Sequence, residues 1–81
     1  MGSKNDRVEA TVTRMGSTST YVFATDDWGR EYFVHKKNVS AIGEKGWDWI
    51  AGTIGDYVVR VEGIPIDQGR GQWTLLEVRV L

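Results

Sequence analysis

The sequence predicts an all-β protein in which five short strands form a small antiparallel barrel. Short runs with alternating apolar and polar residues recur along the chain, which is typical of strands buried on one face. Clusters rich in Gly, Asp and Ser separate most of these runs, and no stretch has the apolar period of a three-turn helix. A length of 81 residues indicates one domain with a small core.

The first strand is expected at Arg7–Met15, because apolar and polar residues alternate there. A turn of small polar residues follows at Gly16–Ser19. Residues 1–6 carry no such pattern, so we expect a disordered N-terminus followed by one domain over residues 7–81. The residues expected to face the core from this strand are Val8, Ala10 and Val12.

The second and third strands are expected at Tyr21–Thr25 and Glu31–His35. The turn between them, Asp26–Arg30, has acidic residues suited to turn chemistry and Gly29, which can adopt a positive φ. Alternation therefore predicts a hairpin with one side on the core. The inward residues are expected to be Val22, Ala24, Tyr32 and Val34.

A long loop, residues 36–56, separates the third and fourth strands. Lys37–Ile42 could form one helical turn closed by Gly43. A connection this long in a small domain either is functional or covers the core. Trp47 and Trp49 lie two positions apart, so an extended segment would place both on one side. They could plug one end of the barrel, or form a second aromatic surface for a ligand or protein partner.

The fourth strand is expected at Tyr57–Gly63, ending or reaching a sheet edge at Pro65, which lacks an N–H donor. Asp67–Gly71 reads as a loop, and Gln72–Leu81 as the fifth strand. The pair Leu75–Leu76 breaks strict alternation, so a bulge is possible there. One side of the fourth strand is expected to carry Tyr57, Val59 and Val61, and the inner side of the fifth Leu76, Val78 and Val80.

Composition excludes several classes of function. The net charge of −1 argues against holding duplex DNA mainly by neutralising phosphates, although single strands can bind through base stacking. The chain has no Cys and one His, so a metal site or His-based catalysis has little support. No apolar run approaches the roughly 20 residues of a membrane span. We expect a cytoplasmic protein that needs no cofactor, is not an enzyme and does not bind membranes.

The outer side of the hairpin is aromatic where a polar surface is expected. If the alternate residues face the core, then Tyr21, Phe23, Phe33 and His35 point outward on adjacent strands. Exposed aromatic rings can stack on nucleobases without reading sequence. These residues therefore form a candidate platform for single-stranded nucleic acid, unless they pack as ordinary core under the segment that contains Trp47.

These residues give the chain a resemblance to the cold-shock domain, a five-stranded OB-type barrel that binds single-stranded RNA and DNA. The two aromatic motifs of that family, approximately K-G-F-G-F-I and V-F-V-H-F, align with Ser19–Ala24 and Tyr32–Lys36. The Ser-Ala-Ile that follows in the family is matched, with a displacement, by Ser40–Ile42. The resemblance implies an OB-type barrel that binds single strands on its aromatic face.

The chain departs from the family pattern at several positions. Thr20 and Val22 replace the two glycines of the first motif, and Lys36 replaces the last aromatic residue of the second. An exposed Trp-Phe pair of the first strand becomes Arg14 and Met15. A guanidinium at position 14 could stack on a base in its place. The losses predict weaker binding than in a full family member.

Other candidate contacts surround the platform. Arg14, Arg30, Lys36 and Lys37 could bind phosphate, or could be ordinary surface charges. Trp28 in the turn could extend the platform or fold back over Phe33. His35 could stack on a base, bind phosphate or a base edge, or be solvated.

Two functions follow as expectations. The first is non-catalytic binding of single-stranded RNA or DNA by base stacking, with low sequence specificity. The second is a protein-interaction module on the same barrel, a homodimer or accessory subunit joined through Trp47 and Trp49. Trp73 is expected to be mostly core.

Overall fold

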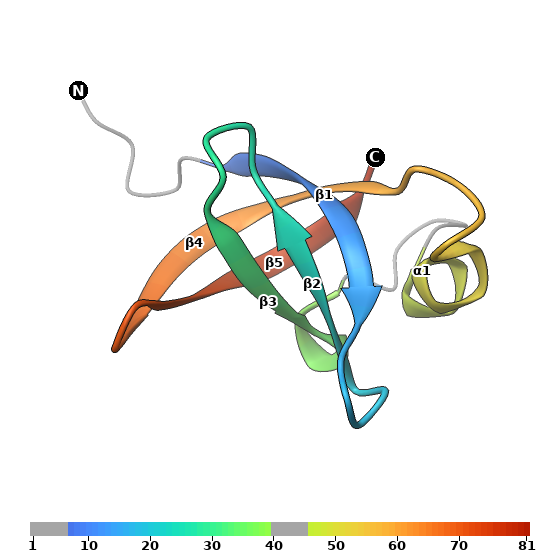
Figure 1. The fold of residues 1–81 in the computed structure, drawn as a ribbon, viewed down its shortest axis with the longest axis horizontal. Coiled ribbons are helices and arrows are strands. Elements are labelled where there is room, and N and C mark those ends of the chain that lie inside the picture. Colours follow the sequence, from blue (N-terminus) through green and yellow to red (C-terminus); the bar gives the residue numbers. More distant parts are fainter. Residues whose placement is uncertain (1–6, 40–45) are drawn as a thin grey trace.

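The protein is a closed five-stranded β-barrel, which confirms the predicted fold class. The computed structural model describes residues 7–39 and 46–81, and the N-terminus expected to be disordered lies outside them. Around the barrel the strands follow the order β1-β2-β3-β5-β4 (Figure 1). The strands are β1 (Val8–Met15), β2 (Tyr21–Thr25), β3 (Glu31–His35), β4 (Arg60–Gly69) and β5 (Gln72–Val80).

The predicted β2–β3 hairpin is confirmed with the same bounds. Its register pairs Val22 with Val34 and Ala24 with Tyr32. All these four side chains are almost fully buried, as alternation predicted. They join inward residues of the other strands in one core, which contains Ala10, Val12, Ile50, Val59, Val61, Leu75 and Val78.

The long loop holds two short helices. A 3₁₀ turn, η1 (Lys36–Asn38), follows β3 directly, whereas the rest of the expected helical turn at 37–42 lies mostly outside the described residues. The helix α1 (Trp47–Thr53) lies beside the barrel (Figure 1). The segment is helical rather than extended, so the condition under which Trp47 and Trp49 would share one side is not met. Alternation by two does not hold in a helix, and Ile50, not a Trp, is the fully buried anchor of this segment.

Strand β4 begins later and runs further than predicted. Tyr57 lies before the strand and is 73% exposed, so its predicted place beside Val59 and Val61 was wrong. Pro65 does not end the strand, because it still pairs with β5. On the other side of β4, the pairing with β1 extends only to Gly63. The missing N–H of the proline is thus tolerated on a stretch where β1 has ended.

Strand β5 contains a bulge, close to where the repeated leucine suggested one. Glu62 pairs with Arg79, but Ile64 pairs with Leu76, so β5 has an extra residue. Glu77 in this stretch has a φ of 49°. The bulge moves Leu75 into the core and Leu76 to the outer face, which reverses the predicted orientation of Leu76.

The seam between β3 and β5 has the shortest strand register in the barrel. These strands are parallel, and their described register contains the pair Phe33–Thr74. A single bridge between Val39 and Val78 continues the contact beyond η1. Within the described residues, no helix has the length and apolar character needed to cross a membrane.

Candidate nucleic-acid interface

Four aromatic rings meet on the outer side of β2 and β3. The cross-strand pairs Tyr21–His35 and Phe23–Phe33 place them side by side. Ring centroids are 4.9 Å apart for Phe23 and Phe33, and 5.6 Å apart for the stacked pair Tyr21 and Phe33. His35 lies 5.7 Å from Tyr21 and 6.1 Å from Phe33. The structure therefore brings together the four predicted residues as one aromatic cluster, outside the core.

The members of this cluster differ in accessibility. Tyr21, Phe33 and His35 are half-buried, but Phe23 is only 8% exposed. The guanidinium of Arg14 lies over the Phe23 ring, 3.9 Å from its centroid. The free surface of the cluster therefore consists of Tyr21, Phe33 and His35, with the planar Arg14 group above the fourth ring.

Tyr21 is held in place by the turn that precedes it. Gly16 donates its N–H to the Tyr21 carbonyl at 2.8 Å, and the ring lies directly against the glycine. A Cβ at position 16 would lie 2.3 Å from that ring. Only glycine therefore permits the Tyr21 ring to rest over this turn and face the cluster.

The β2–β3 turn is organised by Asp26. Its carboxylate accepts hydrogen bonds from the N–H groups of Trp28 and Arg30 at 2.9 Å and from the Tyr32 hydroxyl at 2.8 Å. Burial raises the pKa of Asp26, but the hydrogen bonds from Tyr32, Arg30 and Trp28 outweigh it and hold that pKa below its ordinary value. Burial, followed by the Asp26 contact, raises the pKa of Tyr32. The expectation of turn chemistry for this acidic residue is confirmed.

The predicted cations lie in different surroundings. Lys36 and Lys37 are exposed and, with Thr20 and His35, line a hollow at one end of the aromatic cluster. Arg30 instead lies over the ring of Trp73, 3.9 Å from its centroid. Lys36 and Lys37 can therefore reach a nucleic-acid strand bound on the aromatic cluster. Arg30 lies at the barrel end instead.

Two tryptophans mark that barrel end. Trp28 is 87% exposed at the turn tip, so it does not fold back over Phe33. Trp73 is half-buried and packs edge-on against Tyr32, with centroids 6.4 Å apart. Both line a broad groove that also reaches Phe33. Trp73 is therefore only in part the core residue that was predicted.

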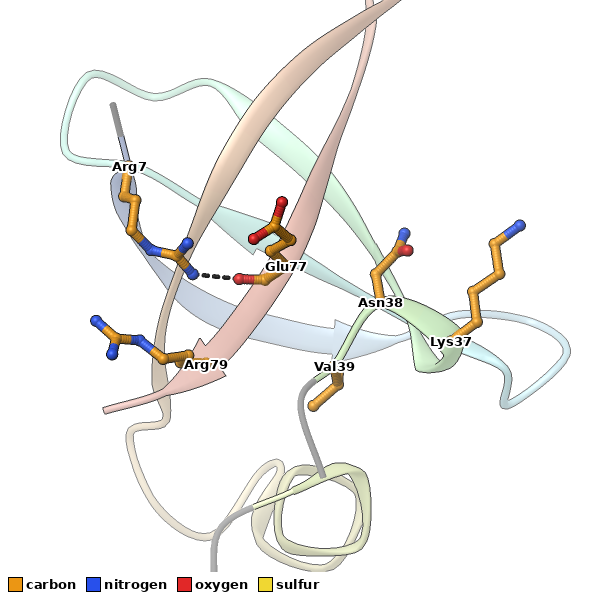
Figure 2. A pocket seen from close by; sticks show the side chains of 6 residues that line it. All are labelled: Arg7, Lys37, Asn38, Val39, Glu77 and Arg79. Atoms are coloured by element: carbon orange, nitrogen blue, oxygen red, sulfur yellow. Dashed lines mark hydrogen bonds between the residues drawn. The ribbon is translucent and has the colours of Figure 1, made fainter. Parts of the chain in front are cut away.

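A polar pocket lies at another part of the barrel surface (Figure 2). Arg7 and Arg79 lie on one side of it and Lys37 on the other. The two arginines bind the Glu62 carboxylate, and Arg7 also donates to the Glu77 carbonyl. The hydrogen bond from Arg79 lowers the pKa of Glu62, against the effect of burial. The two arginines are thus already paired with Glu62, so we interpret their side of this pocket as a structural clamp between strands.

Sequence reasoning missed a groove beside the aromatic cluster. It has a volume of about 590 Å³ and lies over the β3–β5 seam. Its lining residues are Phe33, His35, Lys37, Asn38, Gln68, Gln72, Thr74 and Leu76. The alternation of Gln72, Thr74 and Leu76 could have revealed the outer row of β5 if the bulge had been placed correctly.

In residues 7–39 and 46–81, no three His, Asp or Glu side chains gather in a way that could hold a metal ion. Comparison with known proteins gives no match to a family model, a curated protein or a solved structure. The assignment of a function therefore depends on the residues and their geometry.

Proposed function

We propose that the protein binds single-stranded RNA or DNA without catalysis, by stacking bases on the outer face of β2 and β3. The observation that carries this proposal is the aromatic cluster, where Tyr21, Phe33 and His35 keep free surface on the outside of a barrel whose core is complete without them. The resemblance to the cold-shock domain supports the same reading.

Stacking, rather than charge, is the expected source of affinity. Each base stacked on an aromatic side chain contributes about 1–3 kcal/mol. The net charge of −1 leaves only a local basic group, Lys36 and Lys37 next to His35, to hold phosphate. We therefore expect modest affinity, low sequence specificity from stacking itself and a shallow salt dependence. A cytoplasmic role in RNA chaperoning, expression control or strand protection is consistent with this chemistry.

A titration of intrinsic Trp fluorescence with single-stranded oligonucleotides tests the proposal. Wild-type protein should bind single strands with micromolar or tighter affinity at low salt and duplex of the same sequence far more weakly. Phe33→Ala should lose most of this binding. Val58→Ala, an 80% exposed position outside the strands, serves as the matched control and should bind as wild type. A folded protein that binds no single strand at low salt would refute the proposal.

A protein-interaction surface remains a second candidate, because apolar side chains gather around α1. Trp49 is 40% exposed, Tyr57 73% and Val58 80%. Trp47, the other residue of the predicted surface, packs against the core. A homodimer or a protein partner could cover this exposed group. Sedimentation at two protein concentrations tests it, since a monomer at both would exclude the homodimer.

A further inference from the structure

The groove over the β3–β5 seam continues the aromatic cluster onto the next strand. Phe33 pairs with Thr74 across the seam in a parallel register, so their side chains lie on the same face of the barrel. Residues two positions away share that face, which places Gln72 beside Thr74 on the outside. Phe33 and His35 thus form one wall of the groove, and the outer row of β5 forms its floor.

Strand β4 contributes one more polar side chain to this face. Gln68 lies at the register shift between Asp67 and Gly69 in the β4–β5 ladder, and its side chain lines the groove together with Thr74. Asn38 at the end of η1 lines the groove from the direction of His35. Amide side chains from η1, β4 and β5 therefore converge on a groove whose other wall carries two of the proposed stacking rings.

These amides are not used by the fold. Within residues 7–39 and 46–81, the side chains of Asn38, Gln68 and Gln72 form no hydrogen bond to another described residue. Gln68 and Gln72 are exposed, and Asn38 is half-buried. Each amide can present a donor and an acceptor side by side, which is the pattern needed to recognise the edge of a base.

We propose that this groove reads the edge of the base stacked on Phe33 and His35, with Gln72 and Gln68 as the reading residues, and that it binds a base edge with an amino donor next to a ring-nitrogen acceptor, as in adenine. The inference rests on the proposed binding of single strands and adds a base preference at one position to it. The stacking rings hold the base plane, and the amides lie beside the rings, where the edge of that base projects.

The amide matches a base edge on which an amino donor lies next to a ring-nitrogen acceptor. Adenine has an amino donor at N6 next to a ring-nitrogen acceptor, and one glutamine amide can satisfy both at once. On its Hoogsteen edge guanine presents two acceptors, O6 and N7, so an amide oxygen at that edge meets no donor. Lys37 at the groove mouth supplies donors only and is placed to contact the neighbouring phosphate.

Paired changes in the protein and the ligand test this inference. The ligands are an adenine oligonucleotide of about eight nucleotides and the same oligonucleotide with purine, which lacks the N6 amino group, at each adenine. Wild-type protein should bind the adenine strand about fivefold or more tightly than the purine strand, as expected for one bidentate contact. The double variant Gln68→Met and Gln72→Met keeps the length of the side chains and removes the amides. It should bind both strands equally and retain binding of the purine strand.

The outcomes separate the inference from the proposed function. Equal affinity of the wild type for the two strands would overturn the amide readout while base stacking stands. Discrimination that persists in the double variant would also overturn it, because other groups would then read the base. No binding to either strand by the folded wild type would refute both. Circular dichroism and thermal unfolding of the double variant check that the barrel is intact.

Discussion

Arg14 pairs with Phe23 across the antiparallel β1–β2 ladder, and its guanidinium covers the Phe23 ring, 3.9 Å from the centroid. The two residues face each other across the β1–β2 ladder, next to the β-bulge at Val12–Arg14. Cation–π contact and a planar group above the ring make Arg14 part of the outer face of the aromatic cluster.

Replacement of Arg14 should show whether it acts by stacking or by charge. We expect Arg14→Ala to weaken single-strand binding about 3- to 10-fold, because a planar stacking group is lost. Arg14→Lys keeps the charge but not the plane, and should be almost as weak. Affinities measured at two salt concentrations check this. Full recovery of binding with lysine, together with a wild-type salt slope, would show that only the charge matters.

Replacement of the two phenylalanines should separate stability from binding. Phe23 is 8% exposed, so Phe23→Ala should lower the free energy of unfolding by about 2–4 kcal/mol. Phe33 is half-buried, so Phe33→Ala should lower the free energy of unfolding less than Phe23→Ala does. It should weaken the binding of single strands by the folded protein more. Urea unfolding and oligonucleotide titration measure the two quantities. Binding should be abolished when both are replaced, and retained affinity in a folded double variant would contradict the stacking platform.

Gly16→Ala should displace the Tyr21 ring, while the backbone at position 16 can keep its φ and ψ angles. The added Cβ would lie 2.3 Å from that ring, which must therefore leave its place in the cluster. We expect a several-fold loss of single-strand affinity. Gly52→Ala in α1 is the matched control, because nothing lies within 4 Å of its Cβ position. That variant should bind normally and gain about 0.5–1 kcal/mol of stability from higher helix propensity. Equal affinity of the two variants would show that Tyr21 does not contribute.

Stability should fall at acidic pH because Asp26 loses its charge. Its pKa is lowered in the folded protein relative to the ordinary value of 3.8. A group of this kind stabilises the fold above its unfolded pKa, and the contribution disappears as the pH falls through the lower folded pKa. Asp26→Asn should therefore be less stable than wild type at neutral pH, and the difference should shrink below about pH 4.

Thermal unfolding of both proteins between neutral and acidic pH measures this difference. Asp27→Asn is the control, since the one ion pair that its carboxylate makes with residues 7–39 and 46–81 is an exposed contact of 3.9 Å with Arg60. A constant difference between wild type and Asp26→Asn over the whole pH range would mean that the carboxylate charge is not involved.

The β2–β3 hairpin could be predicted from the sequence because its local signals agree. Strict alternation and a turn with Asp26 and Gly29 determine the same register, and the aromatic outer side follows from it. The structure adds that Arg14 covers Phe23. Alternation assigns a residue to a face but does not show which side chain from the neighbouring strand lies on it.

The second half of the chain was less predictable for physical reasons. The bulge near Glu77 changes the face on which later residues lie, so a reading by alternation placed Leu76 inside when Leu75 is the core residue. The groove on the outer side of β5 was missed for the same reason. The helix α1 has only seven residues and is anchored by Ile50, and so short a helix depends on tertiary contacts rather than on its own period.

The parallel seam between β3 and β5 has a consequence for how the barrel opens and closes. The meander β1-β2-β3 and the β4–β5 hairpin consist of contacts close in sequence, whereas the seam joins Phe33 to Thr74. Because long-range contacts form slowly, we expect the seam to close late in folding. Amide protons along the seam should consequently exchange with solvent before those of the hairpins. A strand bound across Phe33 and Gln72 would bridge the two halves and slow this exchange.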